Sequence, residues 1–248
     1  MSNNDLVGKA ALVCGGSQGI GLAAARALAA RGARVTVLSR SEPPAGDGFA
    51  FLRADLQQIE TLIASLEAQA QPAFQILVNN SGGPPPGPIL DATPEHFLAA
   101  FRQQVLAAHL LVQWVLPAMK AAGYGRIVNV VSTSVREPIP GLGVSNTIRG
   151  ATASWAKTLS REVGTFGVTV NNVLPGATRT ARLEAIIKRK AKDSTQEAVE
   201  AAMRAEIPLG RFAEANELGA VIAFLASPAA GYITGTSIPV DGGRLHCV

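Results

Sequence analysis

Short apolar runs alternate with longer segments of helical periodicity along most of the chain. The runs are rich in β-branched residues and predict strands that begin at residue 10 and recur at 33–41, 49–56, 75–83, 124–134, 167–180 and 235–243. Apolar residues at helical spacing follow in the stretch that ends at residue 32 and at 57–70, 97–121, 144–164, 181–206 and 214–227. This alternation predicts one doubly wound α/β domain of Rossmann type over residues 1–248, with about seven parallel strands and helices on both faces.

Two of the predicted helices carry a pattern that points to self-association. The helix at 97–121 is apolar on most of its faces, so it must be buried on more than one side. The helix at 144–164 has small residues on one face, which suits close helix packing. We expect a homodimer or homotetramer formed through these two helices. The alternative is a central core helix in a monomer.

The segment at 181–206 is charged, rich in alanine and helical in pattern, and it interrupts the alternation of strands and helices. A segment at this place is predicted to act as a lid over a ligand cleft. Its basic residues Lys188, Arg189, Lys190 and Lys192 predict a solvated helix face, and attraction of an anionic substrate is the alternative.

Composition narrows the class of protein. The 248 residues are 48% hydrophobic and only 16% charged, which indicates a globular chain with a sizeable core. The net charge of +4 is spread along the chain except at 188–192, so nucleic-acid binding is not expected. Neither a signal peptide nor an apolar run of the ~18 residues of a membrane span occurs, which predicts a cytoplasmic protein. Two distant cysteines and three isolated histidines predict no catalytic metal.

A glycine-rich turn lies between the first predicted strand and the first predicted helix. Gly15, Gly19 and Gly21 allow backbone to approach a ligand closely where a helix presents unpaired N–H groups. Such a turn suits the diphosphate of a dinucleotide, although glycines with this spacing also form ordinary tight turns.

The end of the second predicted strand bears on the choice of cofactor. An acidic residue there would bind the ribose hydroxyls, but the chain has Ser39 and Arg40 instead. A small serine leaves room for a 2′-phosphate and the arginine supplies a planar, charged partner, which favours NADP(H) over NAD(H). A solvated surface arginine is the alternative.

Together with the glycine turn, several motifs in order resemble the short-chain dehydrogenase/reductase family over nearly the whole chain: Asp55, NNSG at 79–82, GRIVNVVS at 125–132, VNNVLPGATRT at 170–180 and PVDGG at 239–243. The resemblance implies that the turn holds the nucleotide phosphates, that Asp55 and Leu56 contact adenine, and that residues 175–180 contact the nicotinamide carboxamide. The expected cofactor residues are Gly15, Ser17, Gln18, Gly19, Ile20, Gly21, Ser39, Arg40, Asp55, Leu56, Asn80, Ser81, Gly82, Pro175, Gly176, Thr178 and Thr180.

The chain departs from this family at the catalytic positions. The family uses a serine, a tyrosine that transfers the proton, a lysine that lowers the tyrosine pKa, and an asparagine on the long central helix. Ser132 stands where the serine belongs, but the family spacing then leads to Ser145 and Arg149, and Gln104 takes the place of the asparagine. Tyr-x-x-x-Lys has thus become Ser-x-x-x-Arg, a variant that a subgroup of the family shares.

The substitutions change the expected chemistry. A serine hydroxyl is a far weaker acid than a tyrosine, and loss of general acid–base help costs about 10² to 10⁴ in rate. Arg149 is expected to stabilise a developing alkoxide or bind a substrate carboxylate, while water or the substrate supplies the proton. We therefore predict an NADP(H)-dependent oxidoreductase acting on a carbonyl or alcohol substrate. A dinucleotide-binding sensor or partner subunit without redox turnover, and non-redox chemistry in the same cleft, are the alternatives.

Overall fold

Seven parallel strands form the single sheet at the centre of the protein. The computed structural model describes residues 4–68 and 73–247, without the side chain at position 193. The strands are β1 Ala10–Cys14, β2 Arg34–Ser39, β3 Ala50–Arg53, β4 Ile76–Asn79, β5 Gly125–Val130, β6 Val168–Pro175 and β7 Ser237–Val240. Their spatial order is β3-β2-β1-β4-β5-β6-β7, so the order reverses between β1 and β4. This reversal is the point at which a doubly wound sheet opens a crevice for ligands.

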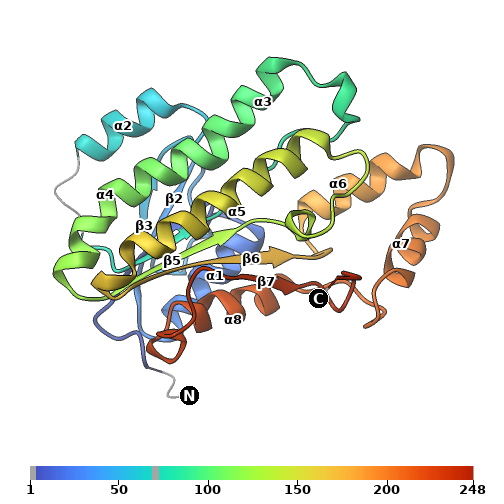
Figure 1. Cartoon of the computed structure of the whole chain (residues 1–248). Coiled ribbons are helices and arrows are strands. Elements are labelled where there is room, and N and C mark those ends of the chain that lie inside the picture. The colour runs from blue at the N-terminus through green and yellow to red at the C-terminus, as the bar shows by residue number, and fades with distance from the viewer. Residues whose placement is uncertain (1–3, 69–72, 248) are drawn as a thin grey trace.

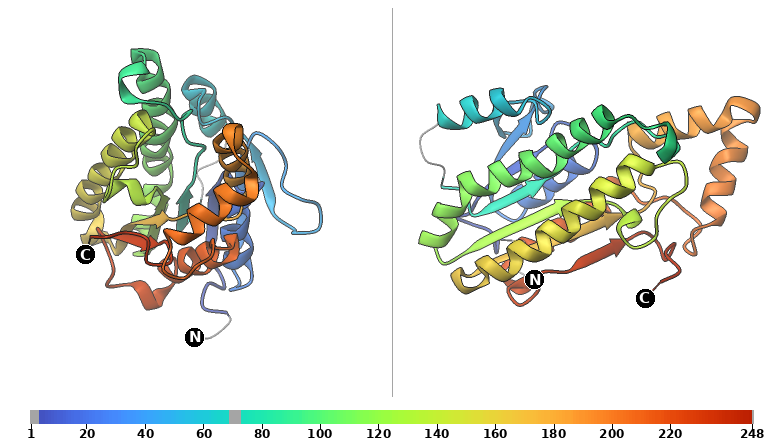
Figure 2. Two further views of the ribbon diagram at one scale, coloured as in Figure 1. Left: turned by 90° about the vertical axis from the view of Figure 1, so that its right-hand side faces the viewer. Right: turned by 45° about the horizontal axis from the view of Figure 1, so that its top comes forward.

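Helices cover both faces of the sheet (Figures 1 and 2), as the sequence pattern predicts. The main helices are α1 Gly19–Ala29, α2 Ile59–Glu67, α3 Pro94–Phe101, α4 Ala107–Ala121, α5 Gly143–Val163, α6 Ala181–Lys190, α7 Gln196–Ala205 and α8 Ala215–Leu225. Helices α1 and α8 pack on one face, whereas α2, α4 and α5 pack on the other. No helix among the described residues is long and apolar enough to cross a membrane.

Alternate residues of each strand supply the two halves of the core. On β1, Ala11 and Val13 face α1 and α8, while Leu12 and Cys14 face the helices of the opposite side. All four side chains are fully buried. Each Val or Leu buried in this way stabilises the fold by about 1.5–3 kcal/mol relative to an exposed one. Burial on both faces explains why the strands read as continuous apolar runs in the sequence.

The long central helix differs from the sequence expectation in its continuity. It begins at Pro94, as the Thr93-Pro94 pair in the sequence predicts, because Thr93 and His96 form a capping box and proline suits the first helical position. A π-helical turn, Arg102–Leu106, separates α3 from α4. The turn admits one extra residue per hydrogen-bonded ring, and apolar periodicity alone does not reveal it. It places Gln104 in the protein interior, where its side chain is buried.

Three asparagines on adjacent strands form a row of side-chain hydrogen bonds. The Nδ2 of Asn79 donates to Oδ1 of Asn129 at 2.9 Å, and the Nδ2 of Asn129 donates to Oδ1 of Asn172 at 2.9 Å. The Nδ2 of Asn172 completes the row with Oγ of Ser237 at 3.0 Å. The four residues are partners in the strand register, so the row ties β4, β5, β6 and β7 together close to the edge where the strands end.

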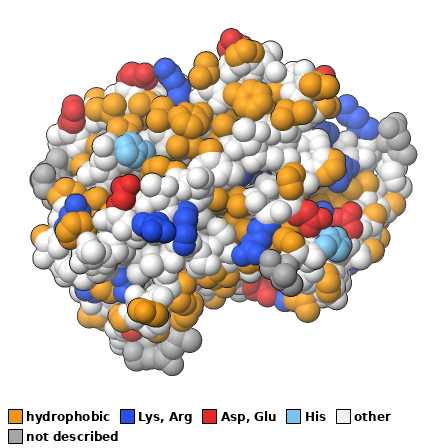
Figure 3. All heavy atoms as spheres, in the orientation of Figure 1, with side chains coloured by type: hydrophobic (Ala, Val, Ile, Leu, Met, Phe, Trp, Pro, Cys, Tyr) orange, Lys and Arg blue, Asp and Glu red, His pale blue; other side chains and the backbone are white. Residues whose placement is uncertain are grey.

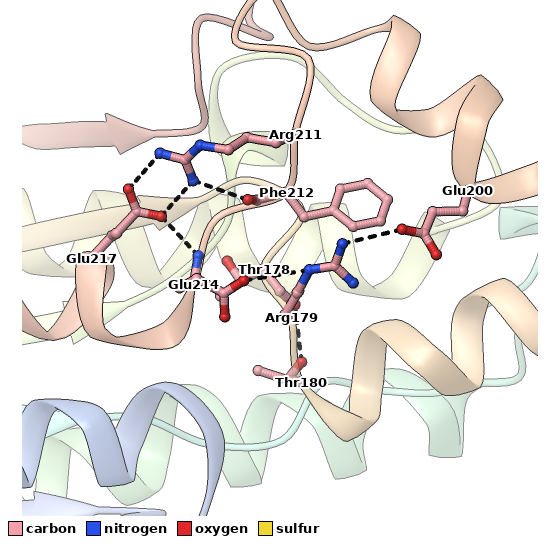
Figure 4. Close-up of polar contacts among 8 residues, drawn as sticks. All are labelled: Thr178, Arg179, Thr180, Glu200, Arg211, Phe212, Glu214 and Glu217. Atoms are coloured by element: carbon pink, nitrogen blue, oxygen red, sulfur yellow. Dashed lines mark hydrogen bonds and ion pairs between the residues drawn. The ribbon is translucent and has the colours of Figure 1, made fainter. Parts of the chain in front are cut away.

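The predicted helical segment at 181–206 forms α6 and α7, which lie beyond the carboxyl edge of the sheet (Figures 1 and 2). Arg179 lies just before α6 and connects this segment to α8. Its guanidinium binds Glu200 of α7 at 3.2 Å and Glu214 next to α8 at 3.4 Å. The same guanidinium lies 5.5 Å from the ring of Phe212. Figure 4 shows this group of contacts, which links α7 to the start of α8.

Candidate functional site

Three glycines shape the turn between β1 and α1. Gly15 has φ of +60°, and Gly19 has φ of +55°. A Cβ atom on Gly21 would lie 2.2 Å from the backbone oxygen of Gly15. Gln18 makes no side-chain cap, so the first N–H groups of α1 are left for a ligand. The turn therefore has the close backbone approach and the free helix N-terminus that a diphosphate requires.

The end of β4 is fastened onto this turn. The Nδ2 of Asn80 donates to the backbone oxygen of Cys14 at 3.2 Å and to that of Gly15 at 3.4 Å. Cys14 is fully buried, and burial raises the pKa of its thiol to about 12. The thiol stays protonated and serves as a small packing group of the strand.

A cleft of about 670 Å³ runs along the carboxyl edge of the sheet. Its lining brings together residues that the sequence places far apart. The sequence-predicted residues in it are Ile20, Asn80, Ser81, Gly82, Ser132, Ser145, Arg149, Pro175, Gly176, Thr178 and Thr180. Three prolines, Pro84–Pro86, and the side chains of Ile139 and Leu142 add an apolar wall.

The remaining predicted cofactor residues lie around this cleft rather than in its lining. Ser17 and Gln18 belong to the glycine turn, and the Oγ of Ser17 accepts a hydrogen bond from Ser41 at 3.3 Å. Ser39 is buried at the end of β2, whereas Arg40 beside it is exposed. Asp55 follows β3 and its Oδ1 accepts a hydrogen bond from the backbone of Gln57, a cleft residue that the sequence reasoning missed.

Ser132 and Arg149 converge at the end of β5. The Oγ of Ser132 accepts the backbone N–H of Ser134 at 3.1 Å, so its own hydroxyl hydrogen remains available to donate. The Nη1 of Arg149 donates to the backbone oxygen of Val130 at 3.0 Å and to that of Val131. These bonds hold the guanidinium against the strand end, one residue from Ser132.

Arg149 is a cation in this position. Burial, with the nearby charge of Arg182 as a smaller cause, lowers the pKa of its guanidinium to about 10. At neutral pH the group therefore keeps its proton and acts through its charge. Its Nε is buried and has no hydrogen-bond partner among the described residues.

Gln104 lies close to the site without lining the main cleft. Its Nε2 donates to the backbone oxygen of Gly82 at 3.4 Å, which links the π-helical turn to the loop after β4. Gln104, Asn79 and Arg149 share a separate cavity of about 20 Å³ behind that loop. The residue therefore holds the loop after β4 through this hydrogen bond and lies outside the lining of the main cleft.

The sequence is similar to those of known enzymes over nearly its whole length. A family model described as enoyl-(acyl carrier protein) reductase matches residues 15–244. The 2,3-dihydroxy-2,3-dihydro-p-cumate dehydrogenase of Pseudomonas putida is 34% identical over 96% of this chain and 95% of its own. The 3-oxoacyl-[acyl-carrier-protein] reductase of Haemophilus influenzae is 31% identical over 95% of this chain and 98% of its own. The chain belongs to the short-chain dehydrogenase/reductase family.

The fold agrees with solved structures of this family. The L-sorbose reductase of Gluconobacter frateurii, solved with NADPH and L-sorbose, superimposes with a TM-score of 0.90 at 28% identity and covers 100% of both chains. The resemblance seen in the sequence motifs is thereby confirmed, and so is the expectation of an oxidoreductase.

No tyrosine lines the cleft of this short-chain dehydrogenase/reductase. Its only two tyrosines lie elsewhere. The hydroxyl of Tyr124 donates to the backbone oxygen of Ala226 at 2.6 Å, and Tyr232 is fully exposed. Ser145 and Arg149 of α5 both line the cleft, so it contains a hydroxyl and a cation from this helix.

Three basic residues on α6 also face the cleft. Arg182, Arg189 and Lys190 line it, whereas Lys188 does not. The basic cluster is exposed, as expected, but it does not form a purely solvated face. The sequence alone could not separate these residues, because charge periodicity does not say which side of the helix meets the cleft.

Proposed function

We propose that the protein transfers a hydride between NADP(H) and a carbonyl or alcohol substrate, through a site in which Ser132 and Arg149 stabilise the substrate oxygen. One observation carries the proposal: Ser132, Ser145 and Arg149 line the same cleft as Ile20 and Thr180, which border the glycine turn. A dinucleotide on the turn and a substrate beside Ser132 would therefore share one cleft.

The residues that would hold the cofactor fit its chemistry. The glycine turn and the uncapped start of α1 suit the diphosphate, and Pro175, Gly176, Thr178 and Thr180 line the same cleft as Ser132. When bound, NADPH supplies the hydride that adds to the carbonyl carbon, while the oxygen takes a proton, and the alcohol and NADP⁺ are released.

The side chains of the site divide the remaining work. The Ser132 hydroxyl donates a hydrogen bond to the substrate oxygen, and Ser145 offers a second hydroxyl in the cleft. The cationic Arg149 stabilises negative charge as it develops on that oxygen. Because neither serine nor arginine is a practical acid at neutral pH, water in the cleft or the substrate itself supplies the proton.

Turnover of NADPH tests this proposal. The protein is mixed with NADPH and a panel of ketones, quinones and oxo acids, and the absorbance of reduced nicotinamide is followed. We expect turnover with at least one compound, and a fall of about 10²-fold or more in kcat/KM for Ser132→Ala. Ser134→Ala is the matched control, because Ser134 is adjacent but lies outside the cleft lining. Tight NADPH binding without oxidation of any compound would instead support a binding protein, which the missing tyrosine also allows.

We further propose that NADP(H) is preferred to NAD(H). Arg40 is exposed at the end of β2, beside the small Ser39, and makes no ion pair among the described side chains. The sorbose reductase that shares the fold was solved with NADPH, which supports the same preference. We expect Arg40→Ala to raise the Kd for NADPH about tenfold and to leave that for NADH unchanged. Arg34→Ala, at the other end of β2, is the control in fluorescence titrations. Equal affinity of the unaltered protein for both nucleotides would contradict the proposal.

We propose that the segment at 181–206 acts as a lid over the substrate. Leu183 and Ile186 of α6 line the cleft, so this helix already forms one of its walls. The ion pair of Arg179 with Glu200 is exposed, and such pairs contribute only about 0–1 kcal/mol. The contact is thus weak enough for α7 to move.

We also propose that the protein forms a homodimer or homotetramer through α4 and α5. Hydrophobic side chains gather on the surface over α3 and α4 (Figure 3), and Leu98 and Phe101 are 61% and 36% exposed there. Trp155 of α5 lies edge-on to His109 of α4 on the same side. Light scattering should give two or four times the chain mass of 25.6 kDa. A mass of one chain would refute the assembly.

A further inference from the structure

The cleft has a marked imbalance of charge. Five basic side chains line it, from Arg149, Arg182, Arg189, Lys190 and Arg244, against a single carboxylate, that of Glu206. Glu206 is already engaged, since its Oε2 lies 2.7 Å from Nη2 of Arg244. Among the described side chains, neither Arg149 nor Arg182 lies within ion-pair distance of any carboxylate. The cleft thus holds positive charge that nothing described in the protein balances.

Arg182 is built into the wall of the cleft. Its Nη1 donates to the backbone oxygen of Gly83 at 3.3 Å, so the side chain reaches from α6 across to the loop after β4. A Cβ atom on Gly83 would lie 2.6 Å from Nη2 of Arg182, so the absence of a side chain there makes room for the guanidinium. The loop and the arginine therefore fit one another.

The positive charges form a series that leads inward. The charge of Arg189 contributes to lowering the pKa of Arg182, and the charge of Arg182 contributes to lowering that of Arg149. All three groups line the same cleft, so their charges act together on an anion bound in it. Arg149 marks the inner end, next to Ser132, and Arg189 marks the outer end on α6. Like charges held together in this way are stabilised when an anion binds among them.

We propose that the reacting compound is an organic anion, a carbonyl or alcohol with a carboxylate or phosphate group that Arg182 binds between α6 and the Gly83 loop. The inference rests on the proposed function, because it names the substrate class of that same cleft. Guanidinium groups match both anions through paired, parallel hydrogen bonds. The cleft also has the apolar wall of Pro84–Pro86, Ile139 and Leu142. The carbon skeleton of the substrate is therefore expected to be largely apolar.

The diphosphate of the cofactor is the competing explanation for these charges. The glycine turn already offers that diphosphate a helix N-terminus, and Arg182 contacts the loop after β4 rather than the turn. Measurement of cofactor affinity separates the two roles. If Arg182 serves the substrate anion, its removal leaves the Kd for NADPH unchanged. If Arg182 serves the diphosphate, its removal raises the Kd for NADPH and leaves the KM for the substrate unchanged.

The experiment uses three substrates: an aryl-substituted oxo acid, its methyl ester and a phosphate-bearing ketone. Each is tested with the unaltered protein and with the variants Arg182→Gln and Lys188→Gln. Lys188 is the matched control, because it is a basic residue of α6 outside the cleft lining. We expect a preference for an anionic compound over the ester, in kcat/KM, that falls about tenfold or more in Arg182→Gln and stays unchanged in Lys188→Gln. Whether the acid or the phosphate is preferred identifies the anion.

A second readout does not depend on turnover. Nonreactive aryl carboxylates and aryl phosphates should raise the melting temperature of the protein, and Arg182→Gln should lose that effect. A rise in melting temperature without NADPH oxidation would support the anion site and refute the proposed oxidoreductase function. Turnover of ester and acid at equal rates, or a rise in the Kd for NADPH as the sole effect of Arg182→Gln, would overturn the anion site and leave the oxidoreductase function intact.

Discussion

Replacing Gly21 with alanine should abolish dinucleotide binding, with a loss of at least about 10²-fold in affinity. The added Cβ would lie 2.2 Å from the backbone oxygen of Gly15 and 2.8 Å from Nδ2 of Asn80. Neither atom is the free end of a flexible side chain, because the first is backbone and the second is held by hydrogen bonds to Cys14 and Gly15. The turn must open to admit the methyl group, which disturbs the N–H groups that a diphosphate needs.

Binding is measured by fluorescence titration with NADPH, and folding by circular dichroism. Gly150→Ala is the matched control, since a Cβ at this position of α5 meets nothing within 4 Å. That variant should bind NADPH normally and gain about 0.5–1 kcal/mol in stability, because alanine favours the helix over glycine. A folded Gly21→Ala protein with unchanged NADPH affinity would show that the turn does not hold the cofactor.

Replacing Arg149 with methionine should lower kcat by about 10²- to 10³-fold while leaving NADPH affinity within a factor of about two. Methionine is comparably long and unbranched but carries no charge, so it removes the cation beside Ser132 with little change in volume. The loss should appear in kcat rather than in KM, because the charge is needed most when negative charge develops on the substrate oxygen.

Arg149→Lys is the informative companion of that variant. Lysine keeps the charge but cannot reproduce the planar group that donates through Nη1 to the backbone oxygens of Val130 and Val131. We expect intermediate turnover, closer to the unaltered protein than to Arg149→Met. Melting temperatures of both variants show whether a loss reflects unfolding. Unchanged kcat in a folded Arg149→Met protein would remove the arginine from the reaction.

The sequence was sufficient to predict the architecture because its signals are local and repeated. Strands buried on both faces appear as apolar runs, as at β1 and β4, and the alternation with helices dictates the parallel sheet. The glycine turn and the Thr93 cap were predictable for the same reason, since each depends on residues a few positions apart. Ser145 and Arg149 could be placed together because four residues separate neighbours on one helix face.

Features that depend on distant parts of the chain could not be predicted in this way. Contact between Gly83 and Arg182 joins residues 99 positions apart, and only the orientation of α6 brings them together. The π-helical turn that buries Gln104 leaves the apolar pattern of its helix unbroken, so the sequence indicates a continuous α-helix. Asn79, Asn129 and Asn172 each look like an ordinary polar residue of a strand until the strand register pairs them.

The asparagine row also gives the edge of the sheet an electrical direction. Every amide in it donates the same way, from Asn79 toward Ser237, so the oxygen end of the aligned dipoles lies at Asn79. That oxygen has no hydrogen-bond partner among the described residues, and it shares its small cavity with Arg149. The array therefore favours a positive charge at position 149, whether it belongs to a lysine or to an arginine.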